Sequence, residues 1–140
     1  MDYKKKIKQY NLIPKVEDIA LSVVNESNEK DSQVWNVYLL NLKDVRIEGV
    51  LVTSKGYGTQ NGEKVKTSVL RHFLDEIAPQ KFKKIEPIHK DVFGLTNEYW
   101  VSFYINKQIY DKKYIFLPES IHPDHFTQVP LLNKPGVMIR

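Results

Sequence analysis

Hydrophobic and polar residues alternate with a period of two along much of this chain, most clearly in the segment 97–117. Its sequence, NEYWVSFYINKQIYDKKYIFL, predicts two strands joined at Asn106-Lys107-Gln108. An alternation of this kind is typical of a half-buried strand. We therefore expect a hairpin at the core of the fold. In its first strand, one face carries Tyr99, Val101, Phe103 and Ile105, and the other carries Trp100, Ser102, Tyr104 and Asn106.

Three earlier segments also alternate and are rich in β-branched residues. Residues 16–25 and 33–42 predict two strands of a hairpin across a polar loop, and residues 44–54 predict a third strand with a bulge at Gly49. The run GYGTQNG at 56–62 follows this strand, but it lacks the Lys-Ser/Thr pair of a phosphate-binding loop. We expect a flexible hairpin loop there.

The segment 64–78 permits two interpretations. Apolar residues recur every four positions from Val65 to Ile77, as in an amphipathic helix, but the same residues also alternate as in a strand. Pro79 then predicts a turn, and residues 81–88 resemble a return strand. We favour a hairpin, because the surrounding elements are short strands at regular spacing. Residues 89–95 predict one helical turn that crosses between two sheets.

These elements predict an all-β protein, an immunoglobulin-like two-sheet sandwich of about seven strands with one short helical turn. If residues 65–77 are helical, the class becomes α+β. We divide the chain into a basic N-terminal arm (1–15), a β-sandwich domain (16–120) and an apolar, proline-containing C-terminal tail (121–140). Such a tail either packs on the domain or contacts a second chain.

Composition and charge limit the classes of function that the chain can have. The chain has 140 residues, enough for one domain with a real core, and no cysteine, so thiolate chemistry and disulfides are excluded and a cytoplasmic location is favoured. No segment approaches the roughly 20 apolar residues of a membrane helix, so we expect no membrane contact. Five lysines and one aspartate in residues 1–15 account for the whole net charge of +4. The remaining chain is neutral, which makes a nucleic-acid partner unlikely.

Candidate chemistry is sparse. His122, Asp124 and His125 form the tightest group of potential metal ligands, but flanking prolines favour a polar turn and no H-E-x-x-H pattern is present. His72 with Asp75 and Glu76 offers an acid or base, and Ser68 or Ser102 offers a nucleophile, but nothing in the sequence fixes their geometry. The chain has no G-x-S-x-G motif and no cysteine. We predict no catalytic residue, no bound metal and no cofactor, and therefore a protein that is not an enzyme.

The remaining interpretation is a non-enzymatic module that binds a protein partner or assembles with itself as a homo-oligomer. Its alternative is a weak single-stranded nucleic-acid binder that uses the lysine-rich arm and exposed aromatic rings. The candidate partner-binding residues are Trp100, Tyr104, Leu131, Leu132 and Val137.

Several short signals after the arm also suggest a relationship. They are Arg71-His72 before Leu74, Pro79 with Phe82 and Lys84-Ile85-Glu86, Leu95-Thr96-Asn97-Glu98, and Gly136-Val137. In these signals the chain resembles a group of short uncharacterised bacterial proteins, some of them labelled phenylalanyl-tRNA synthetase alpha subunit-like. The resemblance implies no site residues. A class II synthetase core needs helices and arginine-bearing motifs that hold ATP, and 140 residues with three arginines do not supply it.

Overall fold

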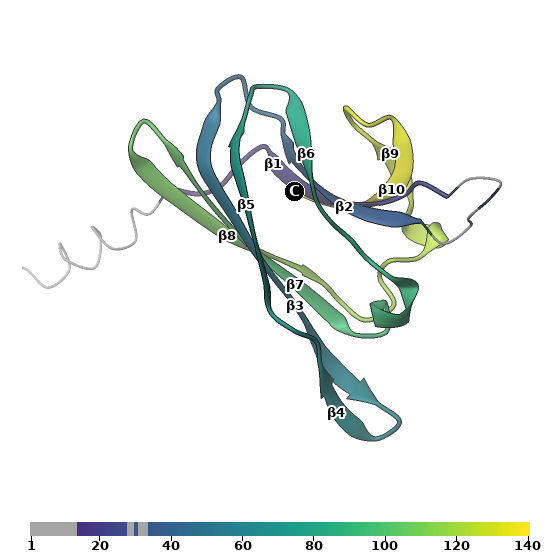
Figure 1. Ribbon diagram of the computed structural model, residues 1–140. Coiled ribbons are helices and arrows are strands. Elements are labelled where there is room, and N and C mark those ends of the chain that lie inside the picture. Colours follow the sequence, from purple (N-terminus) through teal and green to yellow (C-terminus); the bar gives the residue numbers. More distant parts are fainter. Residues whose placement is uncertain (1–13, 28–29, 31–33) are drawn as a thin grey trace, which may run out of the picture.

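The computed structural model describes residues 14–27, 30 and 34–140, in which ten strands form two antiparallel sheets (Figure 1). Sheet A has the order β6-β2-β1-β10-β9, and sheet B has the order β4-β3-β7-β8, with β5 also paired to β3. Sheet A contains β1 (Ile19–Asn25), β2 (Trp35–Asn41), β6 (Lys81–Pro87), β9 (Thr127–Val129) and β10 (Lys134–Ile139). Sheet B contains β3 (Ile47–Gln60), β4 (Glu63–Lys66), β5 (Leu70–Ile77), β7 (Thr96–Ile105) and β8 (Gln108–Phe116).

The main core lies between the two sheets and is built from alternate residues of their strands. Leu21 of β1 and Leu39 of β2 lie directly opposite each other, and both are fully buried. The inward residues of sheet B are almost as inaccessible, and burial of each such side chain stabilises the fold by roughly 1.5–3 kcal/mol. The inward residues of β3 and β7 include Val50, Val52, Tyr99, Val101 and Phe103.

The outer face of sheet A carries a second, smaller core. Ala20, Val24, Tyr38 and Leu40 are buried there against Val129, and the β9–β10 turn covers them. The segment 121–140 therefore contributes β9 and β10 to sheet A, where β10 pairs with β1 from Leu21 to Val24. Further side chains packed on this cluster are Leu42, Leu131, Leu132 and Met138.

Two turns with left-handed residues close the hairpins of sheet B. Asn106 and Lys107 have φ values of 47° and 65°, and Asn61 and Gly62 have values of 52° and 78°. Positive φ at both central residues is the signature of a type I′ turn, whose twist matches that of the paired strands. The hairpin predicted at 97–117 is confirmed, with the turn at Asn106 and Lys107.

The prediction of a flexible loop at 56–62 is wrong. Strand β3 continues through it to Gln60, and the β3–β4 ribbon extends beyond the rest of sheet B (Figure 1). Two glycines lie inside the strand because neighbours approach them closely. A Cβ on Gly56 would lie 3.1 Å from Thr67, and one on Gly58 would lie 3.2 Å from Leu95. The bulge predicted at Gly49 is confirmed by a register shift and a φ of 55°.

Residues 65–66 and 70–77 lie in strands, so the helical alternative is wrong. The favoured hairpin is wrong as well, because β5 and β6 do not pair with each other. Strand β5 pairs with β3 in sheet B, whereas β6 pairs with β2 in sheet A. The turn at Pro79 therefore carries the chain from one sheet to the other. The crossing turn predicted at 89–95 is present as the 3-10 turn η1 (Lys90–Val92), and a second one, η2 (Pro123–His125), precedes β9.

The strand count is ten in the described residues, where about seven were expected. The difference arises because the glycine-rich segment extends β3 and pairs with β4, and because the C-terminal segment adds β9 and β10. The immunoglobulin-like order is not confirmed. That fold places its first strand at the edge of a sheet, whereas β1 here lies between β2 and β10. No helix in the described part of the chain has the length and apolar character needed to cross a membrane.

A carboxylate ties the C-terminal hairpin to the first two strands. Glu26 accepts hydrogen bonds from Tyr38 and from Asn36 Nδ2 (3.0 Å), and its Oε2 lies 2.5 Å from Lys134 Nζ. Burial acts to raise the pKa of Glu26, but the hydrogen bonds from Lys134, Tyr38 and Asn36 outweigh it and hold that pKa below its ordinary value of 4.5. Burial and the nearby carboxylate raise the pKa of Tyr38 to about 12.

We predict that Glu26→Gln destabilises the protein in a pH-dependent way. A lowered folded-state pKa means that the carboxylate stabilises the fold above the unfolded pKa of 4.5 and loses this effect as pH falls through the folded value. The variant should therefore be less stable than the native chain at neutral pH, and the difference should shrink below about pH 4. Urea unfolding at several pH values measures it, with Glu63→Gln as an exposed control. An equal difference at all pH values would contradict this role.

Candidate binding surfaces

The outer face of sheet B is exposed and carries aromatic side chains. Strand β7 directs Tyr99, Val101 and Phe103 inward, so the residues that alternate with them point outward. Trp100 is 47% exposed and Tyr104 is 43% exposed, and the C-terminal segment covers sheet A instead. The two aromatic partner-binding candidates therefore lie on an open sheet face.

Neighbouring strands extend this face. Phe73 on β5 lies opposite Leu51 on β3, and Tyr104 lies opposite Ile109 on β8. Phe73 is 68% exposed, the highest value among the large hydrophobic residues of the described chain. Exposed apolar residues gathered on one face indicate an interaction site more often than isolated ones do. We call the following set the outer apolar face: Leu51, Phe73, Trp100, Tyr104, Ile109 and Ile115.

Two lysines on this face share one carboxylate as their partner. Glu98 lies 3.6 Å from Lys55 Nζ and 3.8 Å from Lys113 Nζ, and it accepts a hydrogen bond from the Tyr57 hydroxyl. Lys113 Nζ also lies 4.8 Å from the ring centre of Trp100. The positive charge nearest to Trp100 is thus compensated by a carboxylate.

One edge of sheet B is free. Strand β8 pairs with β7 at nine consecutive positions and, among the described residues, with no other strand. Because Ile105 and Gln108 close a two-residue turn, hydrogen-bonded and non-hydrogen-bonded pairs alternate from there. The odd-numbered residues of β8 consequently direct their backbone N–H and C=O groups toward the free side. They are Ile109, Asp111, Lys113 and Ile115.

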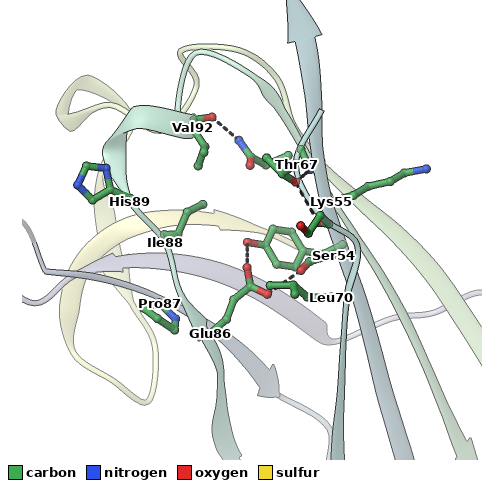
Figure 2. A pocket seen from close by; sticks show the side chains of 13 residues that line it. Ser54, Lys55, Thr67, Leu70, Glu86, Pro87, Ile88, His89 and Val92 are labelled. Atoms are coloured by element: carbon green, nitrogen blue, oxygen red, sulfur yellow. Dashed lines mark hydrogen bonds between the residues drawn. The ribbon is translucent and has the colours of Figure 1, made fainter. Parts of the chain in front are cut away.

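A pocket of about 220 Å³ opens between the two sheets, on the face of β3 opposite to the outer apolar face (Figure 2). It lies where β4 has ended and β5 has not yet begun. Thr67 is still hydrogen-bonded to Gly56 of β3, whereas residues 68–69 belong to no strand. Strand β6 and the segment that follows it form the opposite wall, with Ile88 and Val92 as apolar lining. We call this cavity the Glu86 pocket.

Glu86 is the centre of a polar cluster in this pocket. Its Oε1 accepts hydrogen bonds from Ser54 Oγ (2.6 Å) and His72 Nε2 (2.8 Å), and its Oε2 accepts one from the Tyr99 hydroxyl (3.3 Å). The Glu86 side chain is only 13% exposed. Since Glu86 belongs to sheet A and its three donors belong to sheet B, the cluster joins the two sheets.

This cluster does not have the geometry of a catalytic triad. In a triad the serine donates to the histidine, and the histidine donates to the carboxylate. Here Ser54 and His72 both bond to the same carboxylate oxygen, so the histidine is not placed to activate the serine. Burial raises the pKa of Tyr99, and the charge and hydrogen bond of Glu86 raise it further. Tyr99 therefore remains a neutral hydroxyl donor.

The metal-ligand candidates lie together at η2, where the Nδ1 atom of each imidazole makes a local hydrogen bond. His122 Nδ1 accepts a hydrogen bond from the Asp124 backbone N–H, and His125 Nδ1 donates to the Ser120 carbonyl. The two rings lie 6.3 Å apart in an edge-to-face arrangement. In residues 14–27, 30 and 34–140, no three His, Cys, Asp or Glu residues are grouped to hold a metal.

The apolar candidates of the C-terminal segment make contacts within the chain. Val137 is 9% exposed and pairs with Val23 of β1. Leu131 and Leu132 are partly buried against the second core on sheet A. These three residues therefore belong to the packing of sheet A and lie apart from the outer apolar face of sheet B.

The alternation of hydrophobic and polar residues does not predict the Glu86 pocket. Ser54, His72 and Glu86 occupy inward positions on three strands, and an inward polar residue was the available signal. That signal is weak, because these three residues form a cluster only when β5 and β6 lie in different sheets. The basic arm could not be placed, since residues 1–13 lie outside the described part.

Comparison with known proteins gives no assignment, because no family model and no curated protein matches this chain.

We predict that Glu86→Gln lowers the free energy of unfolding by roughly 1.5–3 kcal/mol, because hydrogen bonds to a charged group are lost in a nearly buried site. Chemical denaturation followed by tryptophan fluorescence measures the change. The matched control is Glu76→Gln, whose ion pair with Arg46 has side chains that are 48% and 51% exposed. That substitution should cost no more than about 1 kcal/mol. Equal effects of the two substitutions would contradict the joining role of Glu86.

Proposed function

We propose that this protein is a non-enzymatic self-assembly module in which the β8 strands of two copies pair antiparallel along their free edges. The supporting observation is that β8 is a regular nine-residue edge strand continuous with the outer apolar face. Unpaired edge groups form a template for pairing with another strand. The pairing would join two copies of sheet B into one.

The charges of β8 favour one register. A two-fold axis at Asp111 would place two aspartates opposite each other, and an axis at Lys113 would place two lysines opposite each other. An axis at Lys112 instead places Asp111 of each copy opposite Lys113 of the other. Opposite charges directly across a strand pair stabilise it, and like charges destabilise it. The two-fold symmetry makes this ion pair occur twice.

The same register continues the apolar surface across the junction. Ile109 of one copy would lie opposite Ile115 of the other, and these residues are 45% and 40% exposed in the single chain. Tyr104 already lies beside Ile109. The outer apolar faces of the two copies would therefore meet along the new pair of strands, which removes apolar area from water.

Lys112 opposes this association. In the proposed register it faces Lys112 of the other copy, and a charge on an edge strand is a common guard against pairing. Its Nζ leans toward Tyr114, 4.9 Å from the ring centre. In an antiparallel pair the two ammonium groups would thus diverge along the strands. The repulsion predicts a weak dimer that Lys112→Gln strengthens.

We predict that Asp111→Lys and Lys113→Asp each weaken self-association at least about tenfold, because each places like charges in both facing positions. An equimolar mixture of the two variants should restore it, since every facing pair is then lysine with aspartate. Sedimentation equilibrium on each variant and on the mixture measures this. A native chain that remains monomeric at high concentration, or a mixture that associates no better than the single variants, would overturn the proposal.

The absence of cysteine from the chain allows a second test by cross-linking. Directly opposite residues of a non-hydrogen-bonded pair have Cα atoms about 4.5 Å apart, within the range of a disulfide. Lys112→Cys should therefore form a covalent dimer under mild oxidation. Lys113→Cys is the matched control and should not. Cross-linking of Lys113→Cys alone would show a different register.

Single-stranded nucleic acid is a second candidate ligand, favoured by the exposure of Trp100 and Tyr104 on one strand. The pairing of Lys55 and Lys113 with Glu98 argues against it, because compensated lysines release few counterions. Quenching of tryptophan fluorescence by oligouridine that disappears in Trp100→Leu would favour this candidate.

A further inference from the structure

The Glu86 pocket has the chemistry of a ligand site, and its use goes beyond the proposed self-assembly. A carboxylate accepts about four hydrogen bonds. Glu86 accepts two on Oε1 and a single long one on Oε2, so Oε2 retains acceptor capacity. A partly satisfied carboxylate beside a cavity attracts hydrogen-bond donors, and cationic donors most strongly.

A second acceptor lines the same pocket. The side-chain amide nitrogen of Asn97 donates to the Val92 and Leu95 carbonyls, at 2.9 and 3.2 Å. This fixes the orientation of the amide, and its Oδ1 receives no hydrogen bond from the described residues. Asn97 therefore adds acceptor capacity rather than a donor.

In the described part of the chain, the lysine that lines this pocket does not fill it. The Lys55 side chain runs away from Glu86 in Figure 2, and its Nζ pairs with Glu98 on the outer face. His72 uses Nε2 to bond Glu86 Oε1, which leaves Oε2 to the pocket side. The walls formed by Leu70, Ile88 and Val92 are apolar.

We infer that the Glu86 pocket binds a small primary ammonium compound with a short apolar chain. The ammonium group donates to Glu86 Oε2, and the apolar chain contacts Ile88 and Val92. A ligand of about five heavy atoms in an open pocket has a Kd of about 1–10 mM.

The probe that tests this is n-butylammonium, followed by amide NMR shifts of the full chain. Saturable shifts are expected at Ser54, Gly56 and Asn97, whereas butyrate and butanol should produce none that saturate. Glu86→Gln should weaken binding at least about tenfold, because a charged hydrogen bond is lost.

Two further variants keep the test decisive. Ser68→Trp places a large ring at the exposed rim and should block binding without removing an inner contact, even if Glu86→Gln fails to fold. Glu76→Gln changes the net charge equally and should bind as the native chain does. Absence of saturable shifts, equal shifts with butyrate, or binding that survives Ser68→Trp would overturn the inference. None of these outcomes depends on whether the protein self-associates.

Discussion

The alternation of β7 between the two faces of sheet B is the constraint on which the other features depend. Its inward residues fill the core, and Val101 and Phe103 are fully buried. Because successive side chains of a strand point to opposite faces, burial of these residues requires exposure of Trp100 and Tyr104. The outer apolar face is therefore a geometric consequence of the core wherever the chain supplies no covering segment, and sheet A receives one whereas sheet B, in the described residues, does not.

The two sheets are also tied by hydroxyl groups from one cross-strand pair. Tyr99 and Tyr114 lie opposite each other on β7 and β8. Tyr99 reaches Glu86 on β6, and Tyr114 donates to the Ile19 carbonyl on β1 at 2.5 Å. Burial raises the pKa of Tyr114, as it does that of Tyr99, so both remain donors. These bonds satisfy buried polar groups and fix the position of sheet B over sheet A.

Much of this fold follows from the local pattern of hydrophobic and polar residues, whereas other parts depend on contacts between distant segments. The β7–β8 hairpin could be predicted because alternation and a short polar turn are properties of adjacent residues. The extension of β3 through Gly56 and Gly58 could not, because Thr67 and Leu95 create the need for glycine from a distance. Asn61-Gly62 was a usable turn signal within the same run. The separation of β5 and β6 into two sheets depends on which edges are free, and no local pattern records that.

The candidate sites also differ in how far they depend on local sequence. The strand alternation alone places Trp100 on the face of β7 away from the core, but its exposure also depends on whether the C-terminal segment covers that face. The Glu86 cluster draws on β3, β5, β6 and β7, so its residues meet only after both sheets have formed. Tyr99 belongs to the cluster and also lies opposite Tyr114 on the edge strand. The Glu86 pocket and the unpaired edge of sheet B therefore adjoin the same hairpin, with pocket residues on β7 and, among the described residues, the unpaired edge on β8.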